Sequence, residues 1–200
     1  MAIRLAFLTV AALLALAGPA AAQYQRLGFL AAGPGGAPEE AYLDGQFTIA
    51  GGFIARFGPP VGLSVGIRSI SGYSRFSADE AALLDSLGIS SGEVEGGHAT
   101  VTEVGLDLMA GYDTGALGGY GWYGIHYYNE SRSDAEITTP SGTFTTQQRD
   151  RADLGPSYGA GLLFHVGPRA AVFGEWFRGG GFDDRMIRMD GLRFGVSGVF

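Results

Sequence analysis

The 200-residue sequence contains no cysteine and no lysine, so arginine supplies all 13 of its basic residues. Without cysteine the chain can form no disulfide, and it has no thiol to carry the lipid of a lipoprotein. Charged residues are scarce, at 16% of the chain, and the excess of acidic over basic residues gives a net charge of −7. This acidic balance argues against a nucleic-acid partner.

Only one long apolar run is present, and it lies near the N-terminus. A short basic segment precedes it, and residues 5–16 are almost purely apolar. The alanines at 20–22 are the small residues that signal peptidase reads, so we expect residues 1–22 to be a signal peptide that is cleaved before Gln23. A membrane anchor is the alternative, but the run is shorter than the roughly 18–20 residues that span a bilayer. We expect residues 23–200 to form one domain.

Eight later segments alternate between apolar and small or polar residues, the period that sends successive side chains to opposite faces of a strand. Tight turns of glycine, proline and aspartate alternate with longer polar connections between these segments. A sheet that crosses a bilayer must close, because an open edge would leave backbone groups unpaired in hydrocarbon. The sequence therefore predicts an all-β fold, an eight-stranded antiparallel transmembrane up-and-down β-barrel with both termini at the short-turn, periplasmic end. The predicted strands are 24–32, 43–57, 61–73, 99–112, 117–128, 152–166, 170–178 and 187–200.

The two faces of these strands differ in a way that indicates which one meets lipid. In the fourth segment Val104 and Leu106 share one parity, opposite Gly105 and Asp107. The rival fold is a soluble, lipocalin-like barrel with its apolar face inside, which would need long charged side chains on the wetted outer face. Here the less apolar face is mainly glycine and serine, which suit the crowded interior of a narrow eight-stranded barrel. We therefore expect the apolar face to contact lipid.

The inward parity also carries charged residues, and a buried charge is costly unless it is paired and hydrogen-bonded. We expect an ion-pair network through the barrel centre, in which arginines bridge carboxylates from other strands and leave a plugged lumen. The alternative is a catalytic carboxylate pair or a path for protons or ions. The predicted network comprises Arg56, Arg68, Glu103, Asp107, Asp153, Glu175 and Arg193, with His165 on the same face. The facing of Trp122 and His126 stays open, because their strand alternates less cleanly.

Aromatic residues cluster where the predicted strands end. In membrane barrels such residues form girdles at the two lipid–water interfaces, and we expect the same role here. The residues concerned are Phe57, Tyr73, Tyr112, Tyr120, Trp122, Tyr123, Tyr127, Tyr128, Trp176 and Phe200.

The predicted outer loops are acidic and contain one helical signal. Ser77 and Glu80 form a capping box ahead of a leucine stripe that ends at Gly88, so a short helix is predicted over residues 77–88. The acidic residues could share divalent cations with lipopolysaccharide phosphates. No spacing matches a calcium-binding loop, however, so a solvated acidic surface is favoured and no metal or cofactor is predicted. The acidic residues are Glu39, Glu40, Asp79, Glu80, Glu93, Glu95, Glu130, Asp134, Glu136, Asp183 and Asp184.

The last nine residues, 192–200, alternate like the other strands and end on Phe200. This ending resembles the closing strand of bacterial outer-membrane β-barrel proteins, in which a final Phe is the assembly signal. Together with the eight strands, it makes the chain similar to the small OmpA-like, OmpX-like or opacity-type barrels. The resemblance implies residence in the outer membrane, contact with its lipid and lipopolysaccharide, and insertion by the barrel assembly machinery. It also implies a role in membrane integrity or surface adhesion, with a surface partner at the outer loops.

An enzymatic alternative rests on His126-Tyr127-Tyr128-Asn129, which is similar to the His-Tyr-Ser-Asn stretch of the outer-membrane lipid A 3-O-deacylases. Acyl transfer in that family needs a serine nucleophile oriented by the histidine. This chain has Tyr128 where the family has its serine. We therefore predict that the protein is not an enzyme. The alternative is a lipid A-modifying enzyme of the deacylase or acyltransferase type, and a narrow ion-conducting pore is a weaker one.

Overall fold

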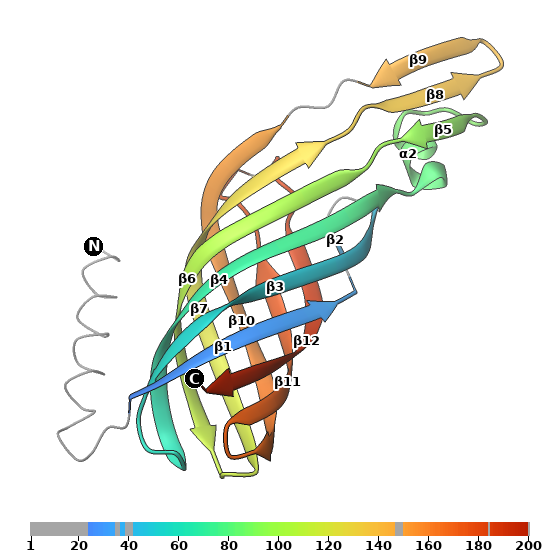
Figure 1. Cartoon of the computed structure of the whole chain (residues 1–200). Coiled ribbons are helices and arrows are strands. Elements are labelled where there is room, and N and C mark those ends of the chain that lie inside the picture. The colour runs from blue at the N-terminus through green and yellow to red at the C-terminus, as the bar shows by residue number, and fades with distance from the viewer. Residues whose placement is uncertain (1–23, 35–36, 39–41, 147–149, 184, 200) are drawn as a thin grey trace.

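The protein is represented by a computed structural model that describes residues 24–34, 37–38, 42–146, 150–183 and 185–199 (Figure 1). The predicted signal peptide and Phe200 lie outside the described residues. Eight long strands dominate the described chain. They are β1 (Tyr24–Gly33), β3 (Leu43–Phe57), β4 (Gly62–Ala78), β6 (Ala99–Asp113), β7 (Leu117–Arg132), β10 (Arg151–Gly167), β11 (Ala170–Gly179) and β12 (Met189–Val199).

These strands form one closed cylinder. Each pairs antiparallel with its neighbours in the order β1-β3-β4-β6-β7-β10-β11-β12, and β12 pairs with β1 over the seam from Leu27–Val199 to Ala32–Phe194. Closure removes the strand edges that would otherwise expose unpaired backbone groups. The structure thus confirms the predicted eight-stranded antiparallel barrel, although β4 and β7 run farther than predicted, to Ala78 and Arg132.

The two faces of the wall are divided as the alternation predicts. Leu106 points outward with 62% of its surface exposed, whereas Asp107 beside it is 1% exposed. Gln46 is an exception, since its parity predicts an inward side chain but it is exposed. A shift in the β3–β4 register between Gly45 and Phe47 marks a bulge, which places Gln46 and Phe47 on the same outer side.

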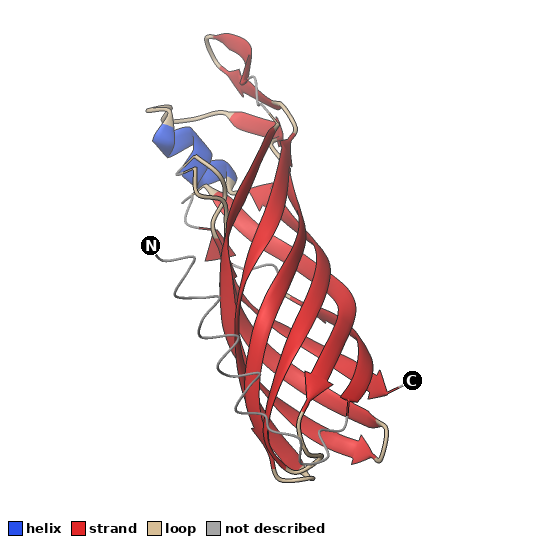
Figure 2. Cartoon of the chain, turned by 90° about the vertical axis from the view of Figure 1, so that its left-hand side faces the viewer, coloured by secondary structure: helices blue, strands red, loops and turns tan. Residues whose placement is uncertain are grey.

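Short turns close one end of the cylinder, and long connections leave the other (Figures 1 and 2). The turn between β3 and β4 uses Gly58 and Gly62, whose φ angles of +142° and +115° favour glycine. In the β6–β7 turn, the Asp113 carboxylate accepts a hydrogen bond from the Gly115 N–H at 2.7 Å. This end is the one predicted to be periplasmic.

The long connections carry a small subdomain that extends beyond the barrel (Figure 2). It consists of the helix α2 (Glu80–Ser86) and a sheet of β5 (Glu93–Gly96), β8 (Ala135–Thr139) and β9 (Gly142–Thr146). Leu83 and Leu84 of the helix pack against Ala135 and Ile137 of the sheet.

The N-cap of α2 differs from the predicted capping box. Asp79 caps the helix by accepting a hydrogen bond from the Ala82 N–H at 3.0 Å, whereas Ser77 still belongs to β4. The helix ends before Gly88, as the sequence predicts, and Gly88 has a φ of +71°. Among the described residues, no helix is both long and apolar enough to cross a membrane.

Candidate functional site

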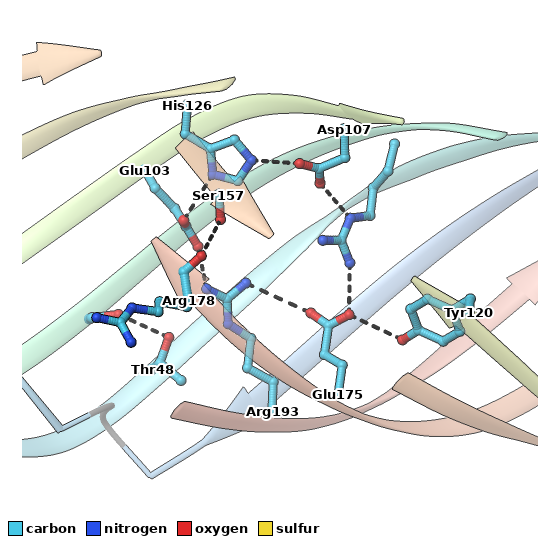
Figure 3. A network of polar contacts seen from close by, with 11 residues as sticks. Thr48, Glu103, Asp107, Tyr120, His126, Ser157, Glu175, Arg178 and Arg193 are labelled. Atoms are coloured by element: carbon cyan, nitrogen blue, oxygen red, sulfur yellow. Dashed lines mark hydrogen bonds and ion pairs between the residues drawn. The ribbon is translucent and has the colours of Figure 1, made fainter. Parts of the chain in front are cut away.

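A closed ring of six ionisable side chains crosses the barrel lumen (Figure 3). No member exposes more than 3% of its surface. Inward parity on five different strands brings these side chains together, because each strand turns every second residue into the lumen. The members are Arg68 of β4, Glu103 and Asp107 of β6, His126 of β7, Glu175 of β11 and Arg193 of β12.

The two arginines bridge the carboxylates of the ring. Arg68 donates from Nε to Asp107 Oδ2 at 2.7 Å and from Nη1 to Glu175 Oε2 at 2.8 Å. Arg193 donates from Nη2 to Glu103 Oε1 at 2.6 Å, and its Nη1 lies 3.9 Å from Glu175 Oε1. Each arginine therefore holds carboxylates from two strands, which is the role that a planar guanidinium suits best.

His126 completes the ring on the side opposite Glu175. Its Nδ1 lies 3.1 Å from Glu103 Oε2, and its Nε2 lies 2.8 Å from Asp107 Oδ1. Each ring nitrogen of His126 therefore faces a carboxylate, and these two contacts close the ring. No group of three acidic or histidine side chains among the described residues is arranged to hold a metal ion.

The ring connects strands that face each other across the cylinder. In the strand order, β4 lies opposite β11, and β6 lies opposite β12. The Arg68–Glu175 and Arg193–Glu103 pairs therefore span the lumen rather than neighbouring strands. These bridges join opposite walls of the barrel through its interior.

Aromatic rings support both arginines from within the lumen. The Arg68 Cζ lies 4.1 Å from the centroid of the Trp122 ring, and the Arg193 Cζ lies 3.7 Å from that of Phe177. A guanidinium over an aromatic face gains cation–π attraction, which is strongest away from water. Trp122, like His126, points inward, which settles the facing that the sequence leaves open.

Glycines on the inner face make room for the ring. A Cβ on Gly124 would overlap Asp107 Oδ1 and the backbone oxygen of Leu106, and one on Gly105 would overlap the His126 ring. The inner face is therefore rich in glycine because the large side chains of neighbouring strands occupy its space.

Two residues of the predicted network lie away from the ring. Arg56 pairs with Asp113 at the short-turn end, where its Nη1 donates to Oδ2 at 3.2 Å and His165 Nε2 lies 2.8 Å from the same oxygen. Asp153 lies at the other end and accepts backbone hydrogen bonds from Leu154 and Asp183. The prediction that all seven residues form one network is therefore wrong for these two, because they lie near strand ends rather than at the height of the ring.

Three of the predicted girdle aromatics lie in the lumen instead. Trp122 and Tyr128 are buried, and the Tyr120 hydroxyl donates to Glu175 Oε2 at 3.1 Å. Their parity on β7 matches that of Gly124 and His126, which is the signal that could have placed them. Tyr123 and Tyr127, on the other parity, are exposed on the outer wall as predicted.

The connection between β11 and β12 folds back into the long-loop mouth. Met186 and Ile187 are buried there against Phe76 and Phe177. Glu130, which the sequence assigns to the acidic outer surface, is instead fully buried and accepts the Ile187 N–H at 2.7 Å. It also pairs with Arg132. Its inward parity near the end of β7 explains this difference, because β7 continues past the predicted end of that strand.

We expect Glu130→Ala to loosen the β11–β12 connection. The change leaves the buried Ile187 N–H without its acceptor, at a cost of about 1–3 kcal/mol. Hydrogen exchange of residues 180–188 should accelerate, while exchange in β6 and β10 should not. Glu136→Ala is the matched control, because Glu136 is exposed on β8. Equal exchange in the two variants would contradict the anchoring role of Glu130.

The short-turn half of the lumen contains a cavity of about 90 Å³ that Arg68 lines together with apolar side chains such as Phe29, Ile54 and Phe173. Arg56 and Asp113 line the same cavity. Arg68 belongs to the charged ring, and the cavity therefore adjoins the ring.

An eight-stranded antiparallel cylinder with an apolar wall, a charged interior, short turns at one end and long connections at the other is the fold of the small outer-membrane β-barrel proteins. A major outer membrane protein from Thermus thermophilus is similar over 88% of this chain and 99% of its own, at a TM-score of 0.51 and 13% identity. Ail, the attachment invasion locus protein of Yersinia pestis, is similar over 88% of this chain and 98% of its own, at a TM-score of 0.49 and 14% identity.

Neisserial surface protein A is similar over 88% of this chain and 96% of its own, at a TM-score of 0.47 and 12% identity. At such identities the likeness concerns the fold alone. No family model matches the chain, and no curated protein matches it in sequence.

Proposed function

We propose that this chain is an outer-membrane protein with a structural or surface-interaction role, supporting membrane integrity or adhesion through its outer loops. The apolar outer wall supports its residence in a membrane, because that wall exposes side chains that only lipid would cover. The buried ring is the observation that supports a structural role for the barrel. A lumen braced by six ionisable side chains serves the shape of the barrel rather than transport.

The outer subdomain is the surface we propose for interaction. Glu93, Glu95 and Glu136 are exposed on its sheet, and Glu95 pairs directly with Glu136. Like charges in directly opposed positions repel each other unless a cationic group lies nearby. The proposed partners are therefore lipopolysaccharide, through shared cations, and a basic surface molecule. The barrel assembly machinery would act earlier, during insertion.

The location can be tested in cells that make the full chain. We expect the protein in the sarkosyl-insoluble envelope fraction, and we expect it to migrate differently on a gel before and after boiling, because a closed barrel resists detergent until it is heated. A protein found in the soluble periplasm with identical migration in both lanes would overturn the proposal.

We expect the folded barrel to conduct no ions in planar bilayers. The ring spans the lumen between opposite strands, so a hydrated ion would have to break buried ion pairs to pass it. Recordings after addition of the refolded protein should show no discrete steps above the protein-free background. Steps that appear only with folded protein, and not with the boiled sample, would support the pore alternative instead.

The arrangement around His126 weighs against the lipid A-modifying alternative. Both of its ring nitrogens are engaged by Glu103 and Asp107, and none of its surface is exposed. Tyr128, which stands at the position of the family's serine, is likewise buried. We therefore expect lipid A from cells with and without the protein to have the same acyl pattern by mass spectrometry.

A further inference from the structure

A hollow of about 300 Å³ lies on the outer wall at the long-loop end of β10 and β11. Two arginines line it, Arg178 and Arg188, together with Pro156, Tyr158 and Phe182. Its remaining lining is the backbone of three successive glycines at 179–181. None of its lining residues is acidic, although the chain as a whole carries a net charge of −7.

The glycines bring the wall and the connection into direct contact at this point. β11 ends at Gly179, so the first residues of β10 extend beyond it. The connection between β11 and β12 lies beside these residues, where the Phe182 N–H donates a hydrogen bond to the Leu154 oxygen at 2.9 Å. A Cβ on Gly180 would lie 3.0 Å from Arg188 Cγ and 3.1 Å from Arg188 Cα, a tight contact that glycine avoids. Arg188 therefore packs closely on Gly180 and lines the same hollow as Arg178.

The hollow lies where the apolar band of the wall ends. On β11 the outward residues run from Val172 through Trp176 to Arg178, the first charged one. Tyr158 pairs with Arg178 in the register and packs edge-to-face on Trp176, with ring centroids 5.9 Å apart. An exposed pair of tyrosine and tryptophan marks the interface between hydrocarbon and headgroups. The two guanidiniums are therefore at the height of the headgroups.

The chemistry of the hollow combines two cationic groups with exposed apolar surface. The Arg178 side chain is 42% exposed and forms an ion pair with Asp190, in which Nη1 lies 3.9 Å from Oδ2. Asp190 also accepts from the Trp176 indole at 2.5 Å, which holds this carboxylate against the wall. Phe182 is 64% exposed at the rim of the hollow. A guanidinium can donate two parallel hydrogen bonds to the oxygens of one phosphate. An exposed phenyl ring offers apolar surface on which an acyl chain can pack.

We propose that this hollow binds a phosphate-bearing lipid of the outer leaflet, with its phosphate between Arg178 and Arg188 and its acyl region on Tyr158 and Phe182. The inference rests on the proposed function, because it requires this wall to face a bilayer. It adds a defined site for one lipid on one side of the barrel. The rest of the apolar wall would contact lipids without selecting among them.

Native mass spectrometry of the full, refolded chain in detergent tests the site directly. The probes are diphosphoryl lipid A, the same lipid A with both phosphates removed, and inorganic phosphate. We expect diphosphoryl lipid A to bind at least about tenfold more tightly than the dephosphorylated form, because charge-assisted hydrogen bonds would be lost. Equal affinity for the two lipids would overturn the proposal. Binding of inorganic phosphate as tight as that of the lipid would overturn the assignment to a lipid.

A double variant locates the site. Arg178→Gln with Arg188→Gln should weaken binding of diphosphoryl lipid A at least about tenfold. The matched control is Arg26→Gln with Arg169→Gln, which removes the same charge from two exposed arginines at the short-turn end. The control should bind within about twofold of the parent chain. An equal loss in both double variants would show a response to overall charge and overturn the site.

Heat-dependent gel migration of each variant shows whether its barrel is folded. The comparison of the two lipids uses only the parent chain. A protein found in the soluble periplasm would refute the proposed location. Failure of lipid selectivity in a folded barrel would refute this site alone.

Discussion

Arg193→Met is expected to lower the free energy of unfolding by about 3–5 kcal/mol, the cost typical of removing one partner from a buried ion pair. The guanidinium is fully buried and donates to Glu103, while Glu175 lies within ion-pair distance. Methionine fills a similar volume but leaves two buried carboxylates with less compensation for their charge. Equilibrium unfolding in denaturant, measured on barrels refolded into lipid vesicles, gives the free energy directly.

The control for this prediction is Arg169→Met, since Arg169 lies exposed in the β10–β11 turn. Its effect should stay within about 0.5 kcal/mol, as is usual for surface substitutions. A double-mutant cycle of Arg193→Met with Glu103→Gln should return a coupling energy of about 0.5–3 kcal/mol, the range for residues in one network. Equal stability of the Arg193 and Arg169 variants would show that the ring contributes nothing to the barrel.

Gly124→Ala is expected to destabilise the barrel by about 1–3 kcal/mol through overpacking. The added methyl group would overlap the carboxylate of Asp107 and the backbone oxygen of Leu106, so the wall between β6 and β7 has to shift. The shift would also disturb Asp107, which holds both Arg68 and His126. Denaturant unfolding of refolded barrels again supplies the measurement.

Gly121→Ala on the same strand is the matched control. Gly121 faces outward, and the nearest atom to its added Cβ would be the Gly159 oxygen at 3.7 Å, an ordinary contact. We expect a change between zero and a stabilisation of about 0.4–1 kcal/mol, because alanine restricts the unfolded chain more than glycine does. Identical effects at 121 and 124 would mean that strand propensity, rather than space for the ring, explains the inner glycines.

The alternation of residue types predicted most of the wall. It placed Leu106 outside and Asp107 inside, and it found all eight barrel strands, because a strand has only two faces and one of them must meet lipid or water. It failed where the backbone departs from regular pairing, as at Gln46 beside the β3 bulge. It also failed at Tyr120, where glycines on both parities of β7 hide the pattern.

The alternation of residue types does not say how high along the barrel axis a side chain lies. This height determined which charged residues form ion pairs. Arg56 lies one residue from the end of β3, and Asp153 lies two residues after the start of β10. The parity of both residues predicts an inward side chain, yet the two side chains contact turn or loop groups at opposite ends of the cylinder. Their distance from the middle of a strand was the available signal. The five network residues in the ring all lie farther from the ends of their strands.

The amino-acid sequence by itself determined the class of fold, the outward apolar face, and a set of inward charges that had to find partners. Only the tertiary structure decided that Arg68 would reach Glu175 and that Arg193 would reach Glu103, since these pairs join opposite strands. The reason is that strand tilt and register stagger set the height of each side chain only when the cylinder closes. The pairing of β11 with β12, together with the path of the connection between them, brings Arg178 and Arg188 to one hollow.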